Sequence, residues 1–302
     1  MPIKQTLLLR MINGLAGFLP SISARLSYQL WTSTYRHKIP QKELPAYDDA
    51  LKQKIIVDGA GIMTYCWGDF GTHRPLVLLL HGWNGRGTQL SLFVETLLSD
   101  GFNVVSFDAR GHGLSDGNHT NVLQSVAIIK RLAVLHGDFF AMIGHSFGAM
   151  CAVNALDRGV VSQKIISISA PTEFAALLKV FSEHISLNEK ASEALKNYVL
   201  SKYEIDSFER ISITGIAPHM TIPLLLIHDR DDDKVPLSQG QKVVNLWGID
   251  TVKDDPEETA LETISANTNS SGTKLHITEG LGHVRILRNT EVQKISLQFL
   301  TN

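Results

Sequence analysis

The chain has little cysteine, little excess of either charge and no long apolar run. Its two cysteines, Cys66 and Cys151, lack the spacing of metal ligands, so we expect two reduced, buried thiols. Lys and Arg number 28 against 30 for Asp and Glu, and the formal net charge of −2 gives no electrostatic reason to bind nucleic acid. With 44% hydrophobic residues, 23 glycines and 10 prolines, the composition disfavours disordered and fibrous classes and is typical of a soluble globular protein.

A short apolar segment follows Lys4 near the N-terminus. Arg10 interrupts it, no small-residue cleavage pattern follows, and it is far shorter than the ~20 residues that span a bilayer. Helical spacing instead predicts an amphipathic helix that ends at Pro20 and has an apolar face of Leu8, Met11, Ile12, Leu15 and Leu19. Two interpretations stay open, a helix docked on the protein itself and weak peripheral membrane contact. Because we find no signal peptide, we expect a cytoplasmic protein.

From about residue 51 onward, short apolar runs alternate with helical patterns, as in βαβ units around a mainly parallel sheet. The fold class is therefore predicted to be α/β. The strongest runs, whose continuous hydrophobicity predicts burial on both faces, are residues 77–80, 104–107, 139–143, 165–168 and 224–227, with a later candidate at 274–278. Residues 54–57 and 62–67, joined through Asp58-Gly59-Ala60-Gly61, predict an antiparallel hairpin at the sheet edge.

Two stretches interrupt the alternation of strands and helices. Residues 172–217 carry apolar stripes at helical spacing and predict an inserted helical cap, in which Phe174 and Leu178 are expected to line a substrate pocket. Residues 251–273 are polar and predict a surface excursion. We therefore divide the chain into an N-terminal helical segment (1–50), an α/β core (51–171 and 218–302) and the helical cap (172–217).

The most specific motif is Gly144-His145-Ser146-Phe147-Gly148, which follows the run at 139–143 and precedes a helix of small residues. A sharp strand-to-helix turn with these glycines exposes the serine hydroxyl at the top of a sheet, with the helix N-terminus behind it. Ser146 is therefore the predicted nucleophile. The alternative is an ordinary glycine-rich turn.

A serine nucleophile needs a general base and a group that orients that base. His283 follows the last strand candidate in Gly280-Leu281-Gly282-His283, where a loop can bring it to the serine oxygen, and we predict it as the base. Other histidines at strand ends, chiefly His81, His145 and His228, are expected to have structural roles.

The orienting acid is harder to choose, because four aspartates follow the run at 224–227. Asp229 is too close to the strand, whereas Asp232 leaves room for the loop to aim a carboxylate at the imidazole before Val235-Pro236 starts the return. We predict Asp232, with Asp231 as the alternative. Its task is to hold the histidine tautomer and to stabilise the imidazolium.

Acyl transfer also needs N–H donors for the charge that develops on the carbonyl oxygen. The segment His81-Gly82-Trp83-Asn84-Gly85 follows the run at 77–80, and the backbone N–H of Trp83 is predicted to pair with that of Phe147 as an oxyanion hole. The Trp83 indole is also a candidate to contact substrate, although core packing is an alternative.

Taken in order, these motifs resemble the α/β-hydrolase superfamily: His81-Gly82-Trp83, the segment from Phe107 to Ser115, Gly144-His145-Ser146-Phe147-Gly148, Asp232 before Val235-Pro236, and His283. The resemblance covers about residues 51–302. It implies an eight-stranded, mostly parallel sheet, a helical cap, a Ser-Asp-His triad, and no metal or organic cofactor. The chain departs from the family in its run of aspartates and in the polar insert before His283.

The residues and the resemblance together predict a serine hydrolase that cleaves a small carboxylic ester through an acyl-enzyme on Ser146. One alternative keeps the triad and acts on a thioester, lactone, amide or carbon–carbon bond, or transfers the acyl group. Another is a non-catalytic ligand-binding protein. Lipid hydrolysis at an interface is a third, suggested by the apolar N-terminal segment. The acyl preference and the oligomeric state do not follow from the sequence.

Overall fold

The computed structural model describes residues 3–248 and 272–302, with side chains from Leu7 onward. The predicted polar excursion at 251–273 therefore lies, apart from its last two residues, outside the described residues. Two compact units divide the chain: Met1–Ser33 with Glu173–Ser212, and Thr34–Thr172 with Ile213–Asn302. We call the first the helical unit and the second the core unit. The segment that ends at Ser33 thus belongs with the helices of the predicted cap, and the segment from Thr34 to Ala50 belongs with the core.

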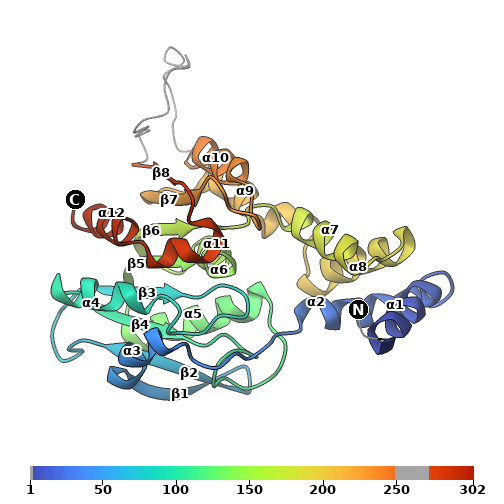
Figure 1. Cartoon of the computed structure of the whole chain (residues 1–302), viewed down its shortest axis with the longest axis horizontal. Coiled ribbons are helices and arrows are strands. Elements are labelled where there is room, and N and C mark those ends of the chain that lie inside the picture. Colours follow the sequence, from blue (N-terminus) through green and yellow to red (C-terminus); the bar gives the residue numbers. More distant parts are fainter. Residues whose placement is uncertain (1–2, 249–271) are drawn as a thin grey trace, which may run out of the picture. The chain divides into compact units, whose positions relative to one another are not determined.

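The core unit contains one eight-stranded sheet with the order β1-β2-β4-β3-β5-β6-β7-β8 (Figure 1). Only the β1–β2 and β2–β4 pairs are antiparallel, and all the other pairs are parallel. The predicted fold class is confirmed. The strands are β1 (Leu51–Val57), β2 (Ala60–Trp67), β3 (Leu76–Leu80), β4 (Asn103–Phe107), β5 (Phe139–His145), β6 (Ser162–Ile168), β7 (Leu224–Asp229) and β8 (Lys274–Thr278).

The edge hairpin of β1 and β2 is also confirmed, with a tighter turn than predicted. Val57 pairs with Ala60, so only Asp58 and Gly59 form the turn, with φ of +48° and +73°. Positive φ at both positions is the two-residue turn whose twist matches the flanking strands. Asp-Gly supplies the residue types that tolerate it.

Helices cover both faces of the sheet. Side chains alternate between faces along a strand, and Val77 and Leu79 of β3 join a buried cluster with Phe93 of α4 and Phe299 of α12. Leu78 points to the other face and is equally buried. On the described chain, the core-unit helices are α3 (Leu44–Asp49), α4 (Ser91–Ser99), α5 (Val122–His136), α6 (Phe147–Asp157), α9 (Ile213–Ile216), α10 (Leu237–Leu246), α11 (Gly282–Arg285) and α12 (Thr290–Thr301), with 3-10 turns at Gln41–Glu43, Ala217–His219 and Ile286–Arg288.

The helical unit is built from α1 (Ile3–Leu15), α2 (Pro20–Thr32), α7 (Phe174–His184) and α8 (Glu189–Tyr203), with a 3-10 turn at Phe208–Arg210. Leu9 and Ile12 of α1 pack with Ile185 and Ala191 in one buried cluster. Asn13 links the same two segments, since its side chain donates to the Ser186 carbonyl (2.9 Å) and accepts from the Asn188 backbone (2.9 Å). The N-terminal helices thus pack on helices that come from a distant part of the sequence.

The prediction for the N-terminal helix was wrong in two details. The helix ends at Leu15, and Pro20 instead begins α2, where a proline at the first helical position loses no hydrogen bond. The buried face is Leu9, Ile12 and Ala16, whereas Met11 and Leu19 of the predicted apolar face are 47% and 46% exposed. None of the helices within residues 3–248 and 272–302 has the length and apolar content needed to cross a bilayer.

Candidate active site

Ser146 occupies the sharp turn between β5 and α6. Its φ of +52° and ψ of −120° lie in a region that residues with a side chain rarely adopt. The turn is fixed on one side by a hydrogen bond of 2.8 Å from the Ser146 backbone N–H to the Ile168 carbonyl at the end of β6. Such strain persists where the surrounding structure fixes the backbone, and it presents the hydroxyl away from the sheet.

The glycines around Ser146 are required by backbone packing. A Cβ at Gly148 would lie 2.4 Å from the Leu80 carbonyl oxygen, and a Cβ at Gly144 would lie 2.5 Å from the backbone of Ala149. Both distances are well inside van der Waals contact, and the obstacles are backbone atoms. A Cβ at Gly82 would likewise lie 2.8 Å from Nδ1 of His145. The segment that carries Trp83 therefore packs directly against the serine turn.

The structure brings the three predicted triad residues together. The Ser146 hydroxyl lies 3.0 Å from Nε2 of His283, within hydrogen-bond distance. Nδ1 of the same ring lies 2.8 Å from Oδ2 of Asp232. If Nδ1 carries the proton and donates to the carboxylate, Nε2 has a free lone pair that accepts from the serine hydroxyl. This geometry can move a proton from the serine oxygen to the imidazole.

Asp232 is buried and fully hydrogen-bonded. Its Oδ1 accepts from the backbone N–H groups of Lys234 and Val235, each at 2.9 Å. Burial alone would raise the pKa of Asp232, but the hydrogen bond from His283 and those from the two backbone N–H groups hold this pKa at about 2. The carboxylate therefore stays charged throughout the neutral range. Asp231, the alternative acid, instead accepts from the Gly280 backbone N–H at 2.9 Å.

Asp229 organises the loop that carries His283, a role that the sequence did not predict. Its Oδ2 accepts from the Thr278 hydroxyl (2.7 Å) and the Leu281 N–H (3.1 Å), and its Oδ1 accepts from the Gly282 N–H (2.8 Å). Burial raises the pKa of Asp229, but the hydrogen bonds outweigh it and the net shift is downward. The residue lies at the end of β7, beside β8, and nothing in the sequence shows that these two strands are neighbours.

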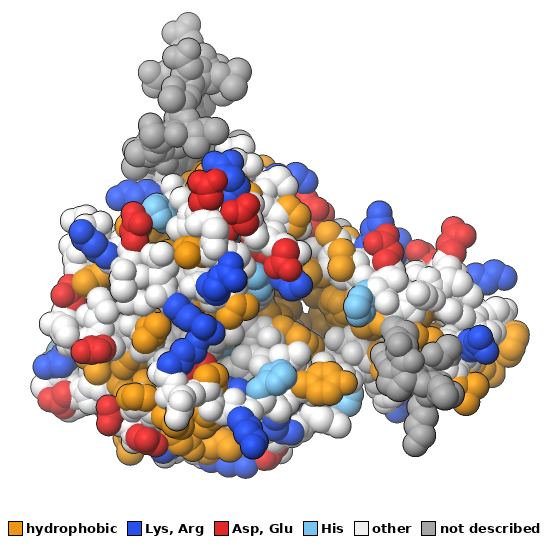
Figure 2. All heavy atoms as spheres, in the orientation of Figure 1, with side chains coloured by type: hydrophobic (Ala, Val, Ile, Leu, Met, Phe, Trp, Pro, Cys, Tyr) orange, Lys and Arg blue, Asp and Glu red, His pale blue; other side chains and the backbone are white. Residues whose placement is uncertain are grey.

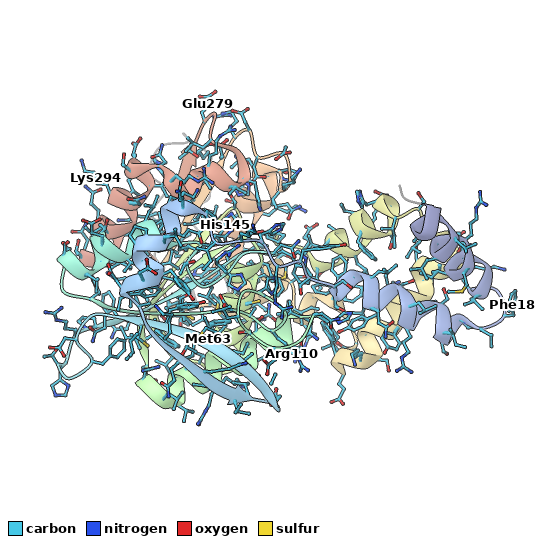
Figure 3. All side chains as sticks on the ribbon, turned by 60° about the horizontal axis from the view of Figure 1, so that its bottom comes forward. Phe18, Met63, Arg110, His145, Glu279 and Lys294 are labelled. Carbon is cyan, nitrogen blue, oxygen red and sulfur yellow. The ribbon has the colours of Figure 1, made fainter. Side chains whose placement is uncertain are left out.

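His145, next to the nucleophile, also supports the histidine loop. Its Nε2 lies 2.8 Å from the His283 carbonyl oxygen, which can only accept, so Nε2 carries the proton (His145 is labelled in Figure 3). Burial lowers the pKa of His145 to about 4, with a further contribution from His283. The ring is therefore neutral at pH 7 and contacts the base through its backbone.

Two more buried histidines support the segment that carries Trp83. His81 donates from Nδ1 to the Gly82 carbonyl (2.7 Å) and accepts at Nε2 from the Ala109 N–H (2.9 Å). His112 accepts at Nε2 from the Asn84 N–H (3.0 Å). Burial lowers the pKa values of His81 and His112 to about 4 and about 3. Both rings accept from an N–H, which a protonated imidazole cannot do.

His228 is structural in the same sense. Its Nε2 donates to the Val235 carbonyl at 2.8 Å, and burial lowers its pKa. The structure thus gives His81, His145 and His228 local supporting contacts and places only His283 against the serine hydroxyl.

The two backbone groups predicted to form an oxyanion hole belong to neighbouring residues. The rings of Trp83 and Phe147 meet edge-on with centroids 5.0 Å apart. Within the described chain, neither backbone N–H donates a hydrogen bond. Phe147 is the first residue of α6, a position where the helix has no carbonyl that could accept from its N–H. Both N–H groups therefore lack an acceptor within the described chain, and their joint role as an oxyanion hole stays a prediction.

Phe174 and Leu178, which the sequence predicts to contact substrate, belong to the helical unit. Both are buried there, and Phe174 packs against the rings of Trp31, Tyr203 and Phe208. Their contact with a substrate stays a prediction.

The described residues contain no cluster of three or more His, Cys, Asp or Glu side chains arranged to hold a metal ion. Cys66 and Cys151 are buried and free of disulfide bonds. Burial raises the pKa of Cys66 to about 11, and it raises that of Cys151 further, so both are thiols at neutral pH.

The chain belongs to the alpha/beta hydrolase family, whose model matches residues 77–292. Among curated proteins, it is 29% identical over 148 residues to a probable protein phosphatase methylesterase 1 of Caenorhabditis elegans (45% of this chain, 39% of that protein). It is 27% identical over 191 residues to the lysophosphatidylserine lipase ABHD12 of Rattus norvegicus (58% of this chain, 46% of that protein). The chain thus spans less than half the length of these two relatives.

Among solved structures, an esterase from Pyrococcus furiosus superimposes with a TM-score of 0.61 and 20% sequence identity, covering 89% of this chain and 97% of that one. At this identity the likeness establishes the fold. It agrees with the family match and with the strand order described above.

Proposed function

We propose that this protein is a serine hydrolase that cleaves a carboxylic ester through an acyl-enzyme on Ser146. The observation that carries the proposal is the continuous chain of contacts from the Ser146 hydroxyl to His283 (3.0 Å) and from His283 to Asp232 (2.8 Å). Membership of a family of hydrolases supports it. The names of the relatives, a methylesterase and a lipase, favour an ester bond over an amide bond.

In the proposed mechanism, the Ser146 oxygen attacks the ester carbonyl while its proton moves to Nε2 of His283. The oxyanion that forms accepts hydrogen bonds from the backbone N–H groups of Trp83 and Phe147. The imidazolium then gives its proton to the alcohol oxygen as the C–O bond breaks, which leaves the acyl group on Ser146. A water molecule, deprotonated by His283, attacks this acyl-enzyme, and collapse of the second intermediate returns the proton to Ser146.

Asp232 keeps the imidazole in the productive tautomer and stabilises the imidazolium in both halves of this cycle. Its low pKa supports this role, because a carboxylate that stays ionised favours the positive charge on the ring. The carboxylate does not need to accept the proton. The same machinery would also serve thioester or lactone hydrolysis or acyl transfer, which share the tetrahedral intermediate.

The direct test compares wild type with Ser146→Ala and with Ser99→Ala, a matched change on the exposed face of α4. We expect p-nitrophenyl butyrate turnover to fall by at least 10³-fold in Ser146→Ala and to stay at the wild-type level in Ser99→Ala. A fluorophosphonate probe should label wild type and Ser99→Ala only. Equal turnover or equal labelling in the Ser146 variant would show that the nucleophile lies elsewhere.

A second candidate function is hydrolysis of lipid esters at a membrane surface, with α1 and α2 as the contact. Leu7, Met11, Phe18, Leu19 and Ile22 expose their apolar side chains, and Phe18 is 74% exposed and points away from the helices of its unit (Figure 3). Residues 1–33 contain three basic residues, Lys4, Arg10 and Arg25, and no acidic residue. Apolar side chains beside cations are suited to an anionic bilayer surface.

Flotation with vesicles that contain phosphatidylglycerol tests this contact. We expect wild type to float with the vesicles and Phe18→Ser to float at least fivefold less, because a phenyl ring supplies a large part of the buried area. Phe70→Ser, which removes an exposed ring from the core unit, is the matched control and should float like wild type. Equal flotation of the two variants would argue against contact through α1 and α2.

A further inference from the structure

The core unit contains a cavity of about 220 Å³ beside the candidate active site. Its lining includes the charged residues Lys38, Lys42, Glu43, Arg86 and Arg288. Drug-sized ligands occupy cavities of about 300–1,000 Å³, so this one suits a compact group. Figure 2 shows Lys and Arg side chains gathered on the viewed face of the core unit, near the elements labelled α3 and α11 in Figure 1.

The cavity has an excess of positive charge. Lys38, Lys42, Arg86 and Arg288 line it, and Glu43 is the one carboxylate among the lining residues. Glu43 is already engaged, because its Oε2 accepts from the Thr88 hydroxyl (2.8 Å) and lies 3.6 Å from Nε of Arg86. Arg86 and Glu43 are 7% and 5% exposed, so they form a buried pair at the wall of the cavity. In the part of the chain that the structure describes, Glu43 forms no ion pair with the other three cations, Lys38, Lys42 and Arg288.

The positive charge of Arg288 acts on Lys42, and Glu43, the carboxylate that opposes this effect, is already engaged by Arg86 and Thr88. Neither Lys42 nor Arg288 makes an ion pair in the described part of the chain. Partial desolvation, and then the positive charge of Arg288, lower the pKa of Lys42. Like charges held close together are unfavourable, and a bound anion between them relieves the repulsion. The surroundings of this cavity therefore favour an anion over a neutral ligand.

The chemistry of the cations indicates which anion. A phosphate group has several acceptor oxygens and up to two negative charges, which match an arginine fork and two ammonium groups better than a single carboxylate does. The buried Arg86–Glu43 pair holds one side of the cavity in place, so such a site is partly preorganised.

The cavity also shares two segments with the candidate active site. Val284, which lines it, directly follows His283, and Asn84 and Gly85 directly follow Trp83. Consecutive Cα atoms are about 3.8 Å apart, so the cavity borders both the segment of the general base and that of the oxyanion hole. We propose that this cavity binds a phosphate group, carried by the ester substrate or supplied as a free ion. The substrate-borne case rests on the proposed function.

Binding is tested without turnover, in the Ser146→Ala background, by titration with inorganic phosphate in a calorimeter. We expect Arg288→Gln and Lys42→Gln each to weaken phosphate binding about tenfold, which corresponds to about 1.4 kcal/mol at 25 °C. Lys294→Gln, which removes an exposed charge from α12 (Figure 3), controls for net charge and should bind like the parent. No phosphate binding by the parent, or equal weakening in all three variants, would overturn the proposal.

The two sources of phosphate are distinguished by turnover of a matched pair of esters, glycerol 1-monobutyrate with and without a 3-phosphate. The readout is kcat/KM for the phosphorylated ester divided by kcat/KM for the neutral ester. If the substrate carries the phosphate group, Arg288→Gln lowers this ratio about tenfold. If the site takes free phosphate, the ratio is the same in wild type and variant while the calorimetric effect remains. Lack of turnover of both esters by wild type would reject the proposed function and leave the calorimetric test of the site intact.

Discussion

The buried histidines predict that the protein loses stability in mild acid, and His81 offers the clearest test. Its ring is 4% exposed, and burial lowers its pKa from 6.5 to about 4. Between pH 7.5 and 5.5 an unfolded histidine goes from roughly 10% to roughly 90% protonated, whereas His81 in the folded state stays neutral. The unfolded state therefore takes up the proton, and stability falls as the pH falls through 6.5.

The size of the effect follows from linkage. A histidine that titrates only in the unfolded state removes about 1.4 kcal/mol of unfolding free energy between pH 7.5 and 5.5. His112 and His145, with pKa values of about 3 and about 4, contribute in the same direction. Together the three remove about 4 kcal/mol, which is a large part of the stability of a typical domain. The loss levels off below about pH 4 for His81 and His145 and below about pH 3 for His112, because the folded rings then bind protons as well.

The assay is urea unfolding followed by tryptophan fluorescence at the two pH values, in wild type and in His81→Gln. The glutamine oxygen can accept from the Ala109 N–H in place of Nε2, but it does not titrate. The substitution has its own cost at both pH values, and the difference between the two pH values removes that cost. We expect this difference to be about 1.4 kcal/mol smaller in His81→Gln.

Exposed His73 provides the control, and His73→Gln should retain the wild-type difference between pH 7.5 and 5.5. The reasoning is refuted if His81→Gln and wild type lose the same unfolding free energy on acidification. His81 would then bind its proton in the folded state, against the hydrogen bond that its Nε2 accepts.

Three further predictions concern the candidate site. Asp232→Asn should lower kcat by about 10⁴-fold with little change in fold, since the amide no longer selects the productive tautomer of His283, and steady-state kinetics with circular dichroism check both parts. Gly148→Ala should lower the unfolding free energy by at least about 2 kcal/mol and lower the yield of folded protein, because the added Cβ meets the Leu80 carbonyl at 2.4 Å. The profile of kcat/KM against pH should show one acidic limb, because protonated His283 cannot accept the serine proton. Asp232 adds no limb of its own, since its pKa of about 2 keeps it ionised. A second acidic limb above pH 4 would contradict this.

The fold was largely predictable from local patterns. The runs at 139–143 and 224–227 correspond to strands that begin at the same residues in the structure, since continuous apolar runs reflect burial on both faces of a parallel sheet. The candidate at 274–278 is also a strand, but it lies at the sheet edge and its residues are only partly buried or exposed. The prediction of α1 as a helix was right, but part of its buried face was wrong, because apolar periodicity reports only which residues can be buried. Which face is buried depends on the partners, and these include residues of a distant part of the sequence, such as Phe181, Ile185 and Ala191, as well as Leu26 and Leu30 of α2.

The candidate site shows the same limit. Ser146, His283 and Asp232 could be chosen from motif context and from the room a loop needs to turn. Asp229 could not, because its role depends on β8 lying beside β7, and strand order is not visible in a single sequence. The cavity at Lys42 and Arg288 is likewise made by segments from opposite ends of the core, which no local pattern connects.

The association of α1 and α2 with α7 and α8 has a consequence for truncated proteins. Removing the segment that ends at Ser33 takes away half of a helical bundle and leaves Ile185 and Ala191 exposed to water. A protein shortened in this way would lose its N-terminal surface and the packing of its remaining helices at once, so a drop in its activity or lipid binding would have two causes. Single substitutions at exposed positions such as Phe18 separate them.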